Sequence, residues 1–73
     1  MKKYKTIEEV DSAIIKLYPP DKYHTEFESF NGAQTVRLIT VTRRDKTASR
    51  EFRVERNYDI EKDGLYTPYY TIN

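Results

Sequence analysis

Residues 25–38 read TEFESFNGAQTVRL, and the Asn31-Gly32 pair at their centre separates two runs that are rich in strand-forming residues. Asn-Gly favours a two-residue type I′ hairpin, because both central positions of that turn have positive φ. The register that follows places Phe27 opposite Val36 on one face and pairs a carboxylate with a guanidinium on the other face. Turn chemistry and cross-strand pairing therefore agree on a first hairpin.

A helix is predicted over residues 6–18, before this hairpin. Thr6 and Glu9 have the spacing of a capping box, in which each side chain satisfies a free backbone amide at the helix start. Apolar residues then recur at intervals of three and four, which makes one apolar stripe. Pro19 and Pro20 end the helix because neither can donate the next backbone hydrogen bond.

A loop over residues 44–48 is expected to connect the second and third strands. This length is chosen because it keeps Phe52 and Val54 beside Leu38 and Val36. In this register Thr40 pairs with Phe52 and Leu38 pairs with Val54. The loop therefore sets the register of the central strand pair.

Residues 61–64 (EKDG) predict a type I turn in which Gly64 supplies a left-handed residue. A fourth strand over 65–72 follows this turn. Pro68 interrupts the strand, and a proline is tolerated there only if the strand lies at the edge of the sheet.

The predicted fold is α+β, with one N-terminal helix on one face of a four-stranded antiparallel meander in the order αββββ. One domain is expected over 1–73, with a basic tail over 1–5 and the sheet over about 23–72. The expected core is Val10, Ile14, Leu17, Phe27, Val36, Leu38, Phe52, Val54, Tyr58 and Ile60. The expected outer face is Glu26, Glu28, Arg37, Ile39, Val41, Arg43, Glu51, Arg53, Glu55, Tyr66 and Tyr70.

Composition excludes several classes of function. Thirteen Lys plus Arg against twelve Asp plus Glu give a net charge of +1, far from the imbalance of a protein that coats nucleic acid. The absence of cysteine excludes disulfide frameworks and thiol chemistry, and a single histidine excludes metal sites built mainly on imidazole. We therefore expect no cofactor and no metal.

The basic start of the chain is followed by charged residues rather than by the apolar run of a signal peptide. No stretch approaches the roughly 18 consecutive apolar residues of a membrane span. These observations predict a cytoplasmic protein without membrane contact. Frequent Lys, Ile, Asn and Tyr suggest an AT-rich genome, and small cysteine-free chains are common among phage and mobile-element accessory proteins.

His24 and Glu26 would lie on the same strand face, where they could form an acid–base pair near neutral pH. The sequence has no nucleophile in a recognisable setting and no glycine-rich phosphate loop. We therefore interpret His24 as structural or incidental and expect no enzymatic activity.

Asp59, Glu61, Asp63 and Gly64 imitate the first half of a calcium-binding loop, which uses alternate oxygen ligands and a glycine at its sixth position. The twelfth position is Tyr70 instead of a bidentate glutamate, and neither flank has a helical pattern. A solvated β-turn is therefore the interpretation we favour.

The main functional hypothesis is a non-enzymatic module that binds or inhibits a protein partner through its exposed sheet face or its last strand. The expected contacts are Ile39, Val41, Tyr66 and Tyr70, because exposed aliphatic and aromatic side chains mark interfaces. A second copy of the chain is an alternative partner. The structural alternative is a strand bulge that turns Ile39 and Val41 into the core.

The second hypothesis is a small nucleic-acid-binding protein that uses a basic hairpin over residues 43–50. Basic side chains at one tip can contact phosphates, although they also keep strands soluble and discourage edge pairing. The candidate contacts are Arg43, Arg44, Lys46 and Arg50.

Overall fold

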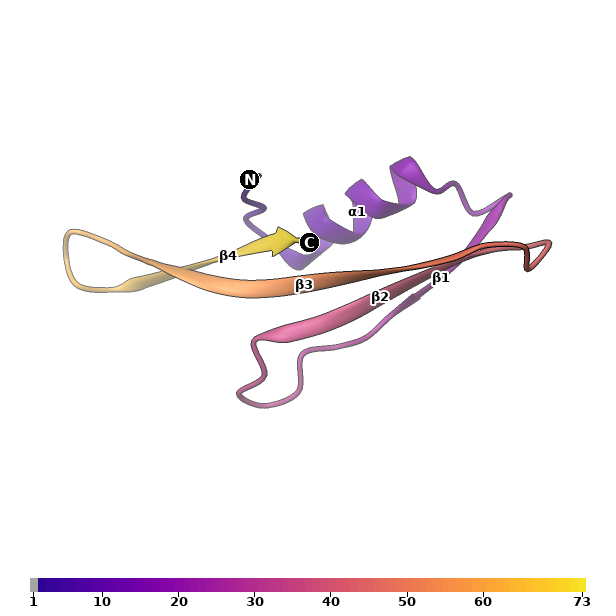
Figure 1. Cartoon of the computed structure of the whole chain (residues 1–73). Coiled ribbons are helices and arrows are strands. Elements are labelled where there is room, and N and C mark those ends of the chain that lie inside the picture. The colour runs from indigo at the N-terminus through magenta and orange to yellow at the C-terminus, as the bar shows by residue number, and fades with distance from the viewer. Residues whose placement is uncertain (1) are drawn as a thin grey trace.

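In the computed structural model, which describes residues 2–73, these residues form one helix and one four-stranded antiparallel sheet with strand order β1-β2-β3-β4 (Figure 1). The elements are α1 (Ile7–Leu17), β1 (Tyr23–Phe27), β2 (Val36–Arg43), β3 (Ser49–Ile60) and β4 (Tyr66–Ile72). The predicted α+β class and the order αββββ are confirmed. The molecule is elongated, with principal extents of 50 × 22 × 17 Å.

The start of α1 has the predicted cap. The Thr6 hydroxyl accepts a hydrogen bond from the backbone N–H of Glu9 at 3.1 Å. The Glu9 carboxylate accepts in turn from the backbone N–H of Lys5 at 2.9 Å, one residue earlier than in the usual capping box. Val10 and Ile14 are buried, as predicted, and they dock the helix on the sheet.

The last turn of α1 differs from the prediction. Leu17 is exposed instead of buried, because Tyr18 takes the next position of the apolar stripe. The Tyr18 ring packs 5.7 Å from the ring of Phe52 and 5.1 Å from that of Tyr23, measured between centroids. A tyrosine just after the helix therefore closes this end of the core.

The register of the first hairpin is also wrong in the prediction. Phe27 pairs with Ile39 instead of Val36, and residues 28–35 form the connection between the two strands. Because side chains alternate between faces, this shift of three residues exchanges the two faces of β2. Ile39 and Val41 become buried, with exposed fractions of 0% and 2%. Burial of such side chains contributes about 1.5–3 kcal/mol each.

The Asn31-Gly32 pair lies in a turn, but not in the predicted type I′ turn. The backbone N–H of Gln34 donates to the carbonyl of Asn31 at 3.1 Å, so Gly32 and Ala33 are the central residues. Gly32 has a φ of +58°, whereas Ala33 is not among the positive-φ residues. A type I′ turn requires positive φ at both central positions.

The β2–β3 connection has the predicted extent, residues 44–48, but a different register. Ile39, and not the residue that follows it, pairs with Phe52. Val36 and Leu38 consequently point to the outer face, where they are half-buried instead of lying in the core. The slip occurs on β2, so Phe52 and Val54 of β3 are buried as predicted.

The observed core lies between α1 and the sheet. Phe27, Tyr58 and Ile60 were predicted to belong to it and are exposed instead. Arg37, predicted on the outer face, is buried together with the core. The buried apolar residues are Val10, Ile14, Ile39, Val41, Phe52, Val54 and Tyr70.

The β3–β4 turn confirms the prediction. The Gly64 N–H donates to the Glu61 carbonyl at 2.9 Å, and Gly64 has a φ of +85°. β4 lies at the edge of the sheet, as Pro68 requires. Within the predicted N-terminal tail, Tyr4 exchanges two backbone hydrogen bonds of 2.8 Å with Tyr70 and so extends the sheet beyond β4.

Candidate functional site

The β3–β4 hairpin extends past α1 at one end of the molecule (Figure 1), and we call its residues 58–68 the arm. Strand pairing places Tyr58 opposite Pro68 and Ile60 opposite Tyr66. By strand alternation these positions share the face of β3 that carries the buried residues Phe52 and Val54. The arm therefore continues the core face of the sheet into a region that the helix does not cover.

This face of the arm is apolar and open to solvent. The exposed fractions are 50% for Tyr58, 71% for Ile60 and 67% for Tyr66, and Leu65 in the adjoining turn is 66% exposed. The two tyrosine rings meet edge to face, with 6.4 Å between centroids and 86° between planes. They line an open hollow of about 300 Å³. Such a concentration of exposed large side chains is typical of a contact surface.

The reverse face of the arm carries charge. Asp59 alternates with Tyr58 and Ile60 along β3, and its carboxylate lies 3.4 Å from the ammonium of Lys3. The same ammonium lies 4.3 Å from the ring centroid of Tyr69. The arm is thus amphipathic, with its apolar side on the α1 face and a paired charge on the other side.

The lengths of α1 and β3 explain why the arm is uncovered. Eleven helical residues span about 16 Å, whereas twelve strand residues span about 40 Å. One short helix cannot cover so long a strand. Sequence analysis missed Tyr58 and Ile60 as surface residues, although this comparison of predicted lengths could have found them.

Of the four predicted partner-contact residues, Tyr66 alone is exposed, and it lies on the α1 face of the sheet instead of the predicted outer face. Ile39 and Val41 lie in the core, as the bulge alternative expected, but the cause is the register of β2. Tyr70 is also buried, and its ring lies 5.9 Å from that of Phe30. The predicted exposure of Ile39, Val41 and Tyr70 is therefore wrong.

Residues 28–35 are held against the sheet by a buried arginine. The guanidinium of Arg37 donates to the Glu28 carbonyl at 2.8 Å and pairs with the carboxylate of Asp11 on α1. Its side chain is buried, whereas that of Asp11 is partly exposed. Arg37 therefore joins the loop, the helix and β2 at one point.

The ring of Phe30, in this loop, lies near two guanidinium groups from β2 and β3. Its ring centroid is 5.7 Å from Arg37 and 4.8 Å from Arg56. Arg56 also donates to the Gln34 carbonyl at 2.6 Å. Cation–π contacts and hydrogen bonds to carbonyls together fix the loop over the sheet.

The predicted nucleic-acid contacts gather at the opposite end of β3 from the arm. Three of them, Arg43, Arg44 and Arg50, already have partners within the chain, and that of Arg43 is the carboxylate of Asp45. The Arg44 Nε donates to the Pro20 carbonyl at 2.7 Å, and the Arg50 guanidinium lies 4.6 Å from the ring centroid of Phe52. The predicted set is Arg43, Arg44, Lys46 and Arg50, and it adjoins the 44–48 turn.

Asp45 organises this turn. Its carboxylate accepts hydrogen bonds from the Thr47 hydroxyl at 2.6 Å and from the Thr47 N–H at 3.0 Å. These bonds lower the pKa of Asp45, with a smaller contribution from the guanidinium of Arg43 at 3.9 Å. The turn therefore contains a carboxylate that offsets part of its basic charge.

The remaining chemical candidates stay at the surface. His24 and Glu26 lie 3.4 Å apart, and both side chains are exposed. No group of three His, Asp or Glu side chains within residues 2–73 is placed to hold a metal ion. In the calcium-like segment, Asp63 instead accepts a hydrogen bond from the Leu65 N–H at 3.1 Å. This carboxylate stabilises the hairpin turn.

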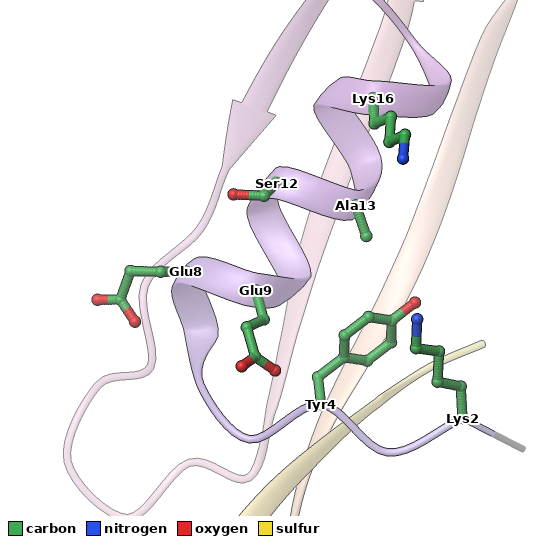
Figure 2. A pocket seen from close by; sticks show the side chains of 7 residues that line it. All are labelled: Lys2, Tyr4, Glu8, Glu9, Ser12, Ala13 and Lys16. Carbon is green, nitrogen blue, oxygen red and sulfur yellow. The ribbon is translucent and has the colours of Figure 1, made fainter.

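A hollow of about 430 Å³ lies between α1 and the N-terminal segment. Figure 2 shows that the Tyr4 ring lies beside the helix, whereas the side chains of Glu8 and Ser12 point to the side of the helix away from Tyr4. The lining carries two lysines and two glutamates, so its charges do not favour a ligand of one sign. The lining residues are Lys2, Tyr4, Glu8, Glu9, Ser12, Ala13 and Lys16.

Within residues 2–73, α1 falls short of the length and apolarity that a bilayer-crossing helix needs, and the chain has no other helix there. No protein-family model matches the chain, and no significant match was found among curated proteins or solved structures.

Proposed function

We propose that this chain is a non-enzymatic binding module that contacts a protein partner through the apolar face of the arm. The observation that carries the proposal is the solvent exposure of Tyr58, Ile60, Leu65 and Tyr66 on one end of a two-stranded ribbon.

Two physical arguments support this use of the arm. A domain of this size has few large apolar side chains to spare, so leaving four of them in water sacrifices burial that the core needs. A two-stranded hairpin is also marginally stable in water by itself. A partner that covers the apolar face would remove both costs. Tyrosine suits such a contact because it is large, has few rotatable bonds and is enriched in interfaces.

Affinity capture tests the proposal. The chain is immobilised and exposed to a lysate of its source cell, beside the double variant Ile60→Ser with Tyr66→Ser. We expect a protein that the wild type retains at both low and high salt and that the double variant loses. Leu17→Ser is the matched control, because Leu17 is an equally exposed aliphatic side chain on α1. Equal retention of the protein by the wild type and by the double variant would contradict the proposal.

A nucleic-acid-binding role for the 43–50 hairpin is the second candidate. The gathering of basic residues at the end of β3 favours it, and the existing partners of Arg44 and Arg50 count against it. Phosphate contacts weaken steeply with salt. Capture of nucleic acid that high salt releases, and that Arg43→Ala with Lys46→Ala prevents, would favour this candidate. A cytoplasmic location and a phage or mobile-element origin stay predictions from composition.

A further inference from the structure

We propose that the partner of the arm is a second copy of this chain, and that two arms pack apolar face to apolar face about a two-fold axis. This inference rests on the proposed function, because it uses the same surface. It adds the identity of the occupant and the orientation in which the occupant binds.

The charge distribution on the arm fits its own copy. In a two-fold interface the same patch meets itself, so any formal charge at its centre would face a like charge. The apolar face presents Tyr58, Ile60, Tyr66 and Pro68, which carry no formal charge near neutral pH. The charge of Asp59 lies on the reverse face, beside Lys3. With a net charge of +1, two copies also repel each other weakly at long range.

The position of α1 selects one orientation of the two arms. The helix stands on the same face of the sheet as the apolar residues of the arm, near the base of the arm (Figure 1). Two arms packed in parallel would bring both helices to the same end, where they would collide. An antiparallel arrangement places the tip of each arm beside the base of the other and leaves room for both helices.

The charges at the two ends of the arm favour this antiparallel arrangement. The tip carries Glu61 and Asp63 against a single Lys62. The base adjoins the N-terminal segment and the first turn of α1, where Lys2 and Lys5 are offset by Glu8 and Glu9. Parallel packing would bring the two acidic tips together, whereas antiparallel packing places each tip beside the mixed charges of the other base.

The size of the surface predicts a weak dimer. Four side chains that each expose half or more of roughly 150–250 Å² offer on the order of 450 Å² per copy. Two copies would bury about 900 Å², and the tip-to-base contacts add to this, which approaches the ~1,000 Å² of the smaller specific interfaces. We therefore expect association at micromolar concentration or weaker.

Sedimentation equilibrium of the purified chain from about 10 µM to about 1 mM tests the inference. We expect the average mass to rise toward twice the monomer mass in the wild type and in Leu17→Ser. Ile60→Ser with Tyr66→Ser should stay monomeric over the whole range. Amide NMR spectra with unchanged β1 and β2 signals will show that the double variant is folded.

Removal of the charges of the tip tests the orientation. Glu61→Gln with Asp63→Asn should leave the dissociation constant of the dimer unchanged within about twofold at low salt, because antiparallel packing keeps the two tips apart. A dimer that tightens by about tenfold in this variant would show that the tips repel each other, and would overturn the antiparallel arrangement.

The outcomes separate the inference from the proposed function. A chain that stays monomeric at all concentrations, but captures a cellular protein only when the arm is intact, would overturn the second-copy inference and support the proposed function. A dimer that persists in the arm variant, together with capture that is equal for the wild type and the arm variant, would overturn both the second-copy inference and the proposed function.

Discussion

Residues 28–35 form a long loop outside the strands, whereas the arm is the projecting end of the sheet, and the aromatic side chains of the two regions differ in burial. The loop folds back, so that Phe30 lies near the guanidiniums of Arg37 and Arg56. The arm projects, and Tyr58 and Tyr66 contact mainly each other and water. Phe30 has cationic partners from neighbouring strands, whereas the apolar face of the arm has no helix above it. The contrast shows that coverage by distant parts of the chain, rather than side-chain type, decides which aromatics are buried.

The largest expected effect comes from removing the arginine that holds the loop. Arg37→Ala should lower the free energy of unfolding by about 3–5 kcal/mol, because the loop carbonyl and Asp11 lose their partner and a buried space is left. Equilibrium urea denaturation will measure the change. Arg37→Met keeps most of the side-chain volume and should lose less, which provides a folded variant if the alanine form does not fold.

The matched control is Arg53→Ala. Arg53 lies on the outer face, 3.3 Å from Glu55, and is exposed. Surface ion pairs contribute little, so the expected loss is below about 0.5 kcal/mol. Equal losses for the two arginines would contradict the distinction between a buried joint and a surface pair.

A second comparison replaces one aromatic residue in the 28–35 loop and one in the arm. Phe30→Ala should lower the free energy of unfolding by about 2 kcal/mol, less than for a fully buried phenylalanine, because Phe30 is half-buried. Tyr66→Ala should change it by less than about 0.5 kcal/mol at concentrations where the chain is monomeric. A larger loss for Tyr66 than for Phe30 in chemical denaturation would reverse the comparison.

The glycines of the two turns give a smaller effect. Gly32 and Gly64 both have positive φ, and a Cβ added at either would meet no heavy atom within 4 Å. Valine at either position should therefore cost roughly 1–2 kcal/mol through its backbone conformation alone. Because the loop is fixed to the sheet, Gly32→Val should lower the urea midpoint. Gly64→Val should mainly speed hydrogen exchange in residues 58–66, and an equal midpoint shift would show that the arm is as firmly integrated.

The smallest effect concerns the short 44–48 turn. The pKa of Asp45 is lowered below its usual 3.8 by the hydrogen bonds from Thr47, so its ionised form favours the folded state. The stabilisation is complete above pH ~4 and is lost as the pH falls through the lowered pKa. Asp45→Asn should therefore melt slightly below the wild type at neutral pH, and the difference should vanish in acid. A difference that persists at the lowest pH would rule out the ionised carboxylate as its cause.

Local signals were sufficient for much of the fold. The Thr6 cap, the proline stop, the extent of the 44–48 loop and the turn at Gly64 each depend on residues close together in the sequence, and each was predicted. Pro68 also identified the edge strand, because a missing N–H is a property of that residue alone.

The register of β2 depended on distant residues. Its sequence VRLITVTR places aliphatic side chains on both faces, so alternation cannot choose between Val36 with Leu38 and Ile39 with Val41. The choice is made by the partners that bury Arg37, which come from α1 and from the loop. The prediction of the contact residues was wrong for the same reason, because the observed register of β2 places Ile39 and Val41 on the core face.

The edge of β4 determines how copies of this chain can aggregate. Fibrils grow when a strand edge offers a continuous row of free amides to the next molecule. The Tyr70 amide points outward but already donates to Tyr4. Pro68, two residues earlier and therefore facing the same way, has no amide hydrogen. The row of outward amides along residues 66–72 is therefore interrupted. This interruption hinders edge-to-edge pairing of sheets through β4, while the face of the arm stays accessible.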